Sequence, residues 1–285
     1  MAATSIEWCD HSINPIKMKL PGGKLINACV KVSPGCANCY AESITGRFWP
    51  IGGAKFPGYS LPILDRGEIV IDESKLWEVL HRRKPTRYFW CDMNDLFGEW
   101  VSFEMIDRCF AVMALTPQHT HLVLTKRAKR MAEWVSRHTS YDVLRRHAIG
   151  TDVWPLPNVW LGVSAEDQQR LDERVPHLLR CPAQIRFLSL EPLLAPIDRL
   201  PLDVISWTII GGESGPGARP SNLAWHRSIR DQCREAGVAF FEKQLGSNPV
   251  DYKQGIGTIP MGLNSRKGND MSEWPIDLRV REYPK

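Results

Sequence analysis

Three cysteines on one short segment, Cys29, Cys36 and Cys39, are the residues of this sequence best suited to chemistry. They are spaced C-x6-C-x2-C, and the turn-forming run Ser33-Pro34-Gly35 would let the segment curl and direct three thiols to one centre. Cysteine thiolates are the usual ligands of iron–sulfur clusters. A four-iron cluster held by only three cysteines leaves one iron open to a substrate or cofactor, so the spacing favours such a site.

Two other interpretations of these thiols remain open. They could bind zinc, with Cys9 or His11 as the fourth ligand. They could also be incidental buried thiols, because free cysteine is among the most buried residue types. Clustered cysteines in an intracellular enzyme more often indicate a metal. The remaining cysteines show no disulfide-framework spacing and are expected to be core or surface thiols: Cys9, Cys91, Cys109, Cys181 and Cys233.

Composition sets broad limits on the fold and the partners. The chain has 285 residues, of which 43% are hydrophobic, enough for a sizeable core. A net charge of +4 at pH 7 permits a nucleic-acid or phosphate-bearing partner without requiring one. No apolar run approaches the roughly 20 residues of a membrane span, and the first residues do not read as a signal peptide. We therefore expect a cytoplasmic protein with no membrane partner.

Short apolar strands alternate with amphipathic helices over much of the sequence. This pattern predicts a parallel sheet covered by helices, and six or so such units predict an α/β fold with a full or partial (β/α) barrel. We expect residues 1–245 to form this barrel and residues 246–285 to wrap onto it within the same domain. The predicted strands are 7–16, 87–91, 121–124, 159–163, 185–188, 205–210 and 238–241; the predicted helices are 41–48, 74–83, 103–113, 131–135, 171–178 and one ending at a Gly237 cap; residues 48–65 are predicted to be an ordered surface loop.

Polar residues gather at the carboxyl ends of these strands, where the active sites of such barrels lie. The alternative for each is a cap or turn that begins the next helix. The candidates are Asp92, Asn94 and Asp95 after residues 87–91, Lys126 after 121–124, Ser164 and Glu166 after 159–163, Glu191 after 185–188, Gly211, Gly212 and Glu213 after 205–210, with Arg219 following them, and Lys243 after 238–241.

Motifs spread over most of the chain carry a resemblance to a known family. They are Ser5-Ile6-Glu7-Trp8, Asn14-Pro15, Lys31-Val32-Ser33-Pro34-Gly35-Cys36, Cys39-Tyr40-Ala41-Glu42, Leu188-Ser189-Leu190-Glu191-Pro192-Leu193, Gly211 to Pro220, and Phe240 to Gln244. They resemble the bacteriophage and prophage three-cysteine-motif proteins, which are themselves similar to the radical S-adenosylmethionine (SAM) superfamily. This sequence departs from the superfamily's C-x3-C-x2-C spacing in its longer first gap. It departs from its nearer relatives by an extra segment, residues 17–27.

The resemblance implies an enzyme in which the three cysteines hold a [4Fe-4S] cluster and SAM is cleaved to a 5′-deoxyadenosyl radical. A flavodoxin- or ferredoxin-like reductant is then an expected partner, and a phage-encoded protein would act in the host cytoplasm. The expected substrate is a nucleotide or a hypermodified DNA base, changed by isomerisation, lyase or related chemistry. A peptide or small-metabolite substrate is one alternative, and a non-catalytic zinc-bearing nucleic-acid-binding protein is another.

The resemblance also suggests which residues bind the cofactor. Carboxylate and amide oxygens suit the SAM ammonium, and hydroxyl and carboxylate groups suit ribose. The glycines would let the backbone approach adenine or substrate closely. Tyr40 could pack near adenine or be an ordinary core aromatic. The assignments are Asp92, Asn94 and Asp95 to the ammonium, Ser164 and Glu166 to the ribose, Tyr40 to adenine, and Gly211 and Gly212 to the close approach.

Other strand-end residues are candidates for the substrate side. Glu191, Glu213 and Lys243 are candidate catalytic groups, with Glu191 as a general base, because carboxylates and a lysine near an apolar centre are costly unless paired or used. Arg219 and Lys126 are candidates for substrate binding, and Lys126 begins a basic stretch that could contact phosphates. A structural ion-pair network is the alternative for each. Four tryptophans could stack on bases or lie in the core: Trp49, Trp90, Trp154 and Trp160.

Overall fold

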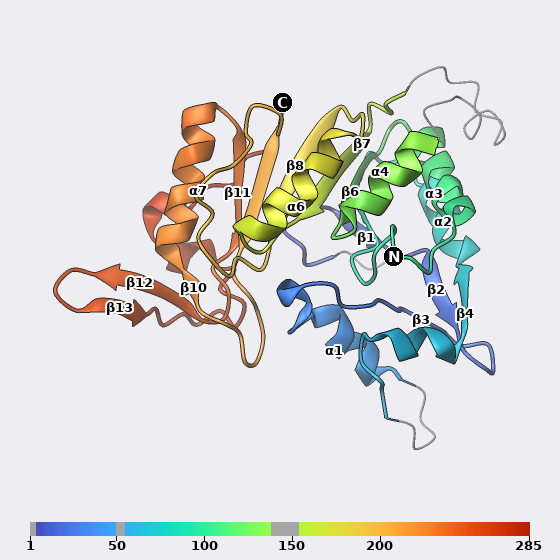
Figure 1. The fold of residues 1–285 in the computed structure, drawn as a ribbon, viewed down its shortest axis with the longest axis horizontal. Helices are drawn as coiled ribbons and strands as arrows, with labels where there is room; N and C mark the ends of the chain where they lie inside the picture. The colour runs from blue at the N-terminus through green and yellow to red at the C-terminus, as the bar shows by residue number, and fades with distance from the viewer. Residues whose placement is uncertain (1–3, 50–54, 138–153) are drawn as a thin grey trace. The chain divides into compact units, whose positions relative to one another are not determined.

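The structure is a computed structural model that describes residues 4–49, 55–137 and 154–285. Its main element is a seven-stranded sheet in the order β1-β5-β6-β7-β8-β9-β11 (Figure 1). The recorded registers of β1 with β5, β5 with β6, β8 with β9 and β9 with β11 are all parallel. The strands are β1 (His11–Ile13), β5 (Arg87–Trp90), β6 (Thr120–Thr125), β7 (Val159–Ser164), β8 (Ile185–Leu190), β9 (Trp207–Gly211) and β11 (Ala239–Gln244).

The predicted fold class is therefore confirmed: the chain has an α/β fold built on parallel strands. The strand order begins at β1 and ends at β11, so the sheet is open and corresponds to the partial rather than the full barrel. Helices follow the strands as expected. They are α1 (Tyr40–Arg47), α2 (Glu73–His81), α3 (Phe103–Leu115), α4 (Ala128–Arg137), α6 (Gln168–Leu179) and α7 (Leu223–Ala236).

Capping residues set where several helices begin and end. The Ser102 side chain accepts a hydrogen bond from Met105 N and starts α3, and the Asn222 side chain accepts from Ala224 N and starts α7. Gly237 adopts a left-handed conformation (φ 67°) directly after α7, as its position in the sequence predicts.

The chain divides into two compact units. The first contains Met1–Val32, Ala41–Leu161 and His177–Gln184, and the second contains Ser33–Tyr40, Gly162–Pro176 and Ile185–Lys285. Strands β1, β5 and β6 belong to the first unit, and β8, β9 and β11 belong to the second. The cysteine segment crosses the division, because Cys29 belongs to the first unit whereas Cys36 and Cys39 belong to the second.

The first unit carries a small antiparallel sheet in the order β3-β2-β4, made of β2 (Ile16–Lys19), β3 (Leu25–Ile26) and β4 (Glu68–Ile71). The single strand predicted over residues 7–16 is wrong, because Asn14 and Pro15 separate β1 from β2. The extra segment 17–27 forms the β2–β3 hairpin. The predicted loop over 48–65 contains a 3-10 helix, η2 (Leu61–Arg66), and its residues 50–54 lie outside the described part of the chain.

In the second unit the C-terminal tail folds into structure that the sequence did not predict. It supplies the hairpin β12 (Pro249–Lys253) and β13 (Gly257–Pro260), and β12 pairs with the short β10 (Ser221–Asn222). Beyond the hairpin, η3 (Met271–Glu273) and η4 (Ile276–Leu278) bring Trp274 and Leu278 into a buried cluster with Leu223 and Leu245. The tail is thereby packed against the start of α7.

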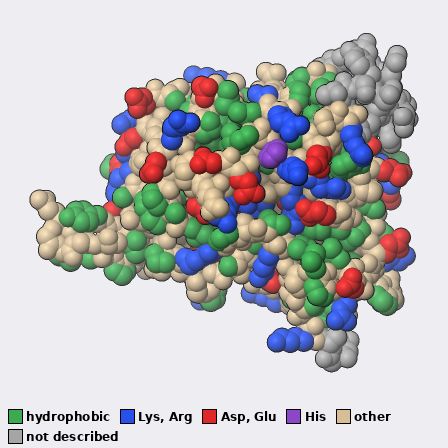
Figure 2. All heavy atoms as spheres, in the orientation of Figure 1, with side chains coloured by type: hydrophobic (Ala, Val, Ile, Leu, Met, Phe, Trp, Pro, Cys, Tyr) green, Lys and Arg blue, Asp and Glu red, His purple; other side chains and the backbone are tan. Residues whose placement is uncertain are grey.

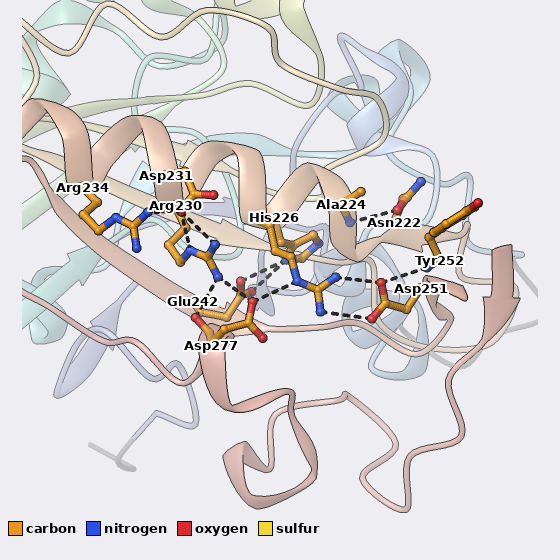
Figure 3. A network of polar contacts seen from close by, with 11 residues as sticks. Asn222, Ala224, His226, Arg230, Asp231, Arg234, Glu242, Asp251, Tyr252 and Asp277 are labelled. Carbon is orange, nitrogen blue, oxygen red and sulfur yellow. Dashed lines mark hydrogen bonds and ion pairs between the residues drawn. The ribbon is translucent and has the colours of Figure 1, made fainter. Parts of the chain in front are cut away.

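Arginines on α7 hold this C-terminal tail through ion pairs (Figure 3). Arg227 makes ion pairs with Asp251 of β12 at 2.7 Å and with Asp277 of η4 at 2.9 Å. Arg230 reaches the same Asp277 carboxylate at 2.6 Å. Because one carboxylate receives two guanidinium groups, the pKa of Asp277 is held below its ordinary value even though partial burial acts to raise it.

Within the parts of the chain that the structure describes, no helix has both the length and the apolar character needed to cross a bilayer. Figure 2 shows acidic and basic side chains interspersed over the face in view, which agrees with the small net charge of +4. Trp90 is fully buried, so the core interpretation of this tryptophan is correct.

Replacing Gly162 with alanine is expected to destabilise the second unit. A Cβ at this position of β7 would lie 2.6 Å from ring atoms of Phe187, which is fully buried beside Trp207. Overpacking of this kind costs about 1–3 kcal/mol, to be measured by urea unfolding. Gly262→Ala is the control, because a Cβ there would meet no atom within 4 Å. Equal unfolding midpoints for the two variants would contradict the packing described for β7.

Candidate functional site

The eight cysteines separate into two groups by exposure. Cys29, Cys36 and Cys39 are half-buried, whereas the other five are buried, and none of the eight forms a disulfide. The interpretation as incidental buried thiols therefore suits the five scattered cysteines but not the three cysteines of the motif. The three motif thiols combine access from solvent with a shared short segment, as ligands for an incoming metal group require.

Arg127 fixes the first part of this segment. It follows β6, is buried, and donates from Nη2 to the carbonyl oxygen of Val30 at 2.8 Å. Its Nη1 pairs with Asp95 at 3.2 Å and its Nε with Glu99 at 2.7 Å. Burial acts to lower the pKa of Arg127, but Asp95, Cys29 and Glu99 outweigh it and raise this pKa. A permanent positive charge thus lies beside Cys29 and holds the backbone of the next residue.

Sequence reasoning missed Arg127 and selected its neighbour Lys126 instead. A signal was available, because Asp95 and Arg127 each lie a few residues beyond the carboxyl ends of β5 and β6, which are adjacent and parallel. In the structure Lys126 is half-buried and its backbone N donates to Asp95 Oδ2 at 3.1 Å. A role for Lys126 in binding a substrate phosphate remains a prediction.

Asp95 serves the same local structure as Arg127. It is 6% exposed, and its carboxylate also accepts from Thr125 Oγ1 at 2.7 Å and from Phe97 N at 3.0 Å. With Arg127 and the Lys126 amide, four donors already occupy this carboxylate. The placement of Asp95 therefore favours a structural role over binding of a ligand ammonium.

Asp92 and Asn94 are less buried than Asp95. Both are half-buried at the carboxyl end of β5. Asp92 Oδ1 accepts from Asn14 Nδ2 at 2.5 Å, and Asn94 Nδ2 donates to the carbonyl oxygen of Ile16 at 2.7 Å. The other amide atom of that side chain, Asn94 Oδ1, is buried and has no hydrogen-bond partner among the residues that the structure describes. An acceptor of this kind suits an ammonium or hydroxyl donor of a ligand.

Glu166 fixes the second part of the cysteine segment. It follows β7, is fully buried, and accepts from Gly35 N through Oε1 at 3.0 Å and from Arg174 Nη1 through Oε2 at 3.1 Å. A Cβ at Gly35 would lie 3.1 Å from the carboxylate carbon, so glycine allows this approach. The short 3-10 helix η1 (Pro34–Cys36) is thereby held at its second residue. Both oxygens of Glu166 are engaged, which favours a role in holding the segment over binding of ribose.

A second contact to the segment is the glutamate latch, formed by Asn38, Glu213 and Arg219. Asn38 Nδ2 donates to Glu213 Oε2 at 2.9 Å, and Arg219 donates to the same oxygen from its backbone N at 2.9 Å and from Nε at 3.0 Å. Burial acts to raise the pKa of Glu213, but the hydrogen bonds from Arg219 and Asn38 hold it below its ordinary value. The guanidinium of Arg219 thus bonds to the Glu213 carboxylate. The same carboxylate bonds to Asn38, the residue before Cys39.

Glu191 and Lys243 meet at the carboxyl ends of β8 and β11. Lys243 Nζ lies 2.9 Å from Glu191 Oε1, and Ser189 Oγ donates to Glu191 Oε2 at 3.1 Å. The two side chains keep 14% and 19% of their surface exposed, so the pair is accessible from solvent. Ser164 Oγ donates to the backbone oxygen of Glu191 at 3.2 Å, which places this hydroxyl next to the pair rather than in the open.

The two glycines at the end of β9, Gly211 and Gly212, are each required for a different reason. A Cβ at Gly211 would lie 2.7 Å from Glu191 Oε1, so this glycine gives the carboxylate room. A Cβ at Gly212 would collide with the backbone oxygen of Leu245 and with Ser221 Oγ. Close approach of the chain's own backbone thus explains Gly212 without any ligand.

Tyr40, at the start of α1, is 46% exposed, so its interpretation as an ordinary core aromatic is wrong.

The candidate fourth zinc ligands, His11 and Cys9, lie at the opposite ends of the strands from the point where Arg127 holds Val30, the residue after Cys29. His11 pairs with Tyr88, which in turn pairs with His121 near the start of β6, and Cys9 precedes His11. Arg127, which holds the residue after Cys29, follows the other end of β6. Four residues of strand separate these ends by about 13 Å, whereas two ligands of one zinc ion lie within about 4 Å. Among the described residues, no three His, Cys, Asp or Glu side chains are already grouped to hold a metal ion.

Three residues form a chain that resembles a nucleophile, a base and an orienting acid. Ser221 Oγ lies 2.7 Å from His226 Nε2, and His226 Nδ1 lies 3.0 Å from Glu242 Oε2; His226 and Glu242 are seen under α7 in Figure 3. All three are 1% exposed or less, and burial raises the pKa of Glu242. A substrate cannot reach this serine. These three hydrogen-bonded residues therefore join α7 to β10 and β11 and do not form a catalytic site.

A model of a protein family described as "Protein of unknown function (DUF5131)" matches residues 3–272. The chain belongs to the DUF5131 family. No curated protein matches this member of the family. Among solved structures, "Spore photoproduct lyase complexed with dinucleoside spore photoproduct" is similar with a TM-score of 0.39 and 9% sequence identity, over 85% of this chain and 68% of that chain.

Replacing Glu166 with glutamine is expected to destabilise this DUF5131 protein by about 3 kcal/mol, because Arg174 would be left buried without its counter-charge. Urea unfolding gives the loss, and amide hydrogen exchange at Gly35 should become faster. The matched control is Asp167→Asn, which weakens the partly exposed pair of Asp167 with Arg170 and is expected to cost at most about 0.5 kcal/mol. A Glu166→Gln variant as stable as this control would contradict the anchoring role.

The glutamate latch should make stability depend on acid pH. Because the pKa of folded Glu213 lies below its ordinary value of 4.5, its contribution is full above that value and is lost as pH falls through the folded pKa. Arg219→Gln is therefore expected to cost about 1–3 kcal/mol at pH 7, and the difference from the wild type should shrink toward pH 3. Urea unfolding at several pH values tests this. Arg234→Gln, at a residue whose side chain is 76% exposed, is the control. A pH-independent difference for Arg219→Gln would rule the latch out.

Proposed function

We propose that this protein is a radical SAM enzyme whose cysteines Cys29, Cys36 and Cys39 bind a four-iron cluster. The observation that carries the proposal is the contrast between these three half-exposed thiols and five buried ones, on a segment held by buried charged side chains. Thiols without a function would not require the segment that carries them to be held in this way. It suits ligands that must keep fixed positions around one metal group.

The residues present fit such a group. The donors are thiols that solvent can reach, no disulfide occupies them, and the Arg127 cation lies near Cys29, where it stabilises negative charge on the sulfur. When bound, the cluster and SAM would supply reductive carbon–sulfur cleavage and hydrogen abstraction from an unactivated carbon. The chain's own contribution would be to bind, orient and exclude water.

Two sets of strand-end residues are proposed to contact ligands. Asp92 and Asn94 offer carboxylate and amide oxygens for the ammonium of SAM, and Asn94 Oδ1 still lacks a donor within the described residues. The partly exposed pair of Glu191 and Lys243 can hold a proton between Oε1 and Nζ and pass it to or from a substrate. Glu191 is the proposed general base because its carboxylate also remains bonded to Ser189 and so keeps its orientation.

The proposed substrate is a nucleotide or a hypermodified DNA base, converted by an isomerase or lyase reaction, with a flavodoxin- or ferredoxin-like electron donor. The mild net positive charge of +4 permits an anionic partner of this kind. A peptide or small metabolite is the alternative substrate. A zinc-bearing nucleic-acid-binding protein is less favoured, because Cys9 and His11 lie at the other end of the strands from Cys29.

Anaerobic purification tests the proposal through iron and sulfide content. The wild type is expected to carry roughly four of each per chain and to release 5′-deoxyadenosine when reduced in the presence of SAM. Cys36→Ala should lose most of the iron and all of this release. Cys181→Ala, at a buried cysteine outside the motif, should keep both. Stoichiometric zinc without iron, or equal iron in the two variants, would refute the proposed function.

A further inference from the structure

Lys17 is a lysine that the proposed chemistry does not use. It lies on β2 in the first unit, is half-buried, and donates from Nζ to Asn27 Oδ1 at 2.7 Å, across the base of the β2–β3 hairpin. Among the residues that the structure describes, no carboxylate forms an ion pair with it. An ammonium that is partly removed from water and bonded only to a neutral amide makes folding less favourable.

The charged groups around Lys17 come from several elements. Burial lowers the pKa of Lys17 and Lys75 of α2 acts in the same direction, whereas Asp72, Cys91 and Asp92 act to raise it. Asp72 also caps α2 through Ser74 N, and Asp92 also accepts from Asn14. Neither carboxylate forms an ion pair with Lys17 Nζ in the described chain, so the ammonium keeps the capacity to bind another anion.

Two further features mark the same corner of the first unit. Asn94 Nδ2 bonds to the carbonyl oxygen of Ile16, the residue before Lys17, and its buried Oδ1 is unpartnered in the described chain. Cys91, directly before Asp92, has a φ of 62°, a left-handed conformation that a residue with a side chain seldom adopts. A strained strand end, an orphan acceptor and a lysine without a counter-ion together indicate a place for a ligand.

We propose that Lys17 binds the anionic group, a carboxylate or a phosphate, of a ligand at the carboxyl ends of β1 and β5, and that Asn94 Oδ1 accepts a hydrogen bond from a donor of the same ligand. The inference rests on the proposed function for the presence of a small anionic ligand at this edge. An oxyanion would supply the charge that Lys17 lacks, and its binding would offset the cost of burying the ammonium.

Competitive acetylation of the full chain tests the proposal without an activity assay. The protein is treated with an amine-selective acetylating reagent, and the rates at Lys17 and Lys19 are measured by mass spectrometry. Lys19 is the internal control because it is exposed and only two residues away on β2. The probes are SAM for a carboxylate and thymidine 5′-monophosphate for a phosphate, with adenosine and thymidine as analogues that lack the anion.

One charged probe is expected to slow acetylation of Lys17 by about tenfold or more and to leave Lys19 unchanged, and the probe that does so identifies the anion. Lys17→Gln should weaken binding of that probe by a similar factor in calorimetry, whereas Lys19→Gln should not. Equal protection by the neutral analogues, or none by any probe, would overturn the inference. Iron content is read separately, so a protein without iron that still shows phosphate protection at Lys17 would refute only the proposed function.

Discussion

A buried charge must be paired, and this constraint shapes the segment that carries the cysteines. Arg127 and Glu166 are both buried, and removing each from water costs several kcal/mol that an ion pair alone does not always recover. Each gains a further hydrogen bond from the segment, Arg127 to Val30 O and Glu166 from Gly35 N. Satisfying these two charges and holding the cysteine segment are therefore a single requirement, met separately within each unit.

The same requirement sorts the polar residues at the strand ends. Asp95, Glu166 and Glu213 have their carboxylate oxygens occupied by donors from the chain, so they contribute shape and charge balance. Glu191 and Lys243 are paired as well, but they keep part of their surface exposed. A group that exchanges a proton with a ligand needs that exposure. Accessibility, rather than residue type, separates the candidates for chemistry from those that hold the structure.

Much of the fold followed from local sequence patterns. Continuous apolar runs predicted β5 through β9 and β11, and helical periodicity with a glycine cap predicted α7, because burial on both faces of a parallel strand leaves a strong signal. The β12–β13 hairpin left none, since all of its strand residues except Pro249 are half-buried or exposed. Arg127 was missed for another reason. Its partners Val30, Asp95 and Glu99 lie 28 to 97 residues away in sequence, and only the folded chain brings them together.

Gly211 and Gly212 show why neighbouring residues of one motif need separate explanations. The pair suggested a backbone that approaches a ligand, yet Gly212 is required by the chain's own Leu245 and Ser221, whereas Gly211 makes room for the Glu191 carboxylate. Only Gly211 makes room for an ionisable group that is partly exposed, the Glu191 carboxylate. The buried chain of Ser221, His226 and Glu242 makes the same point from the opposite direction, because its geometry suits catalysis but its burial excludes a substrate. A site at these strand ends therefore has to be assigned from residues such as Glu191 and Lys243, whose contacts and exposure both allow a ligand.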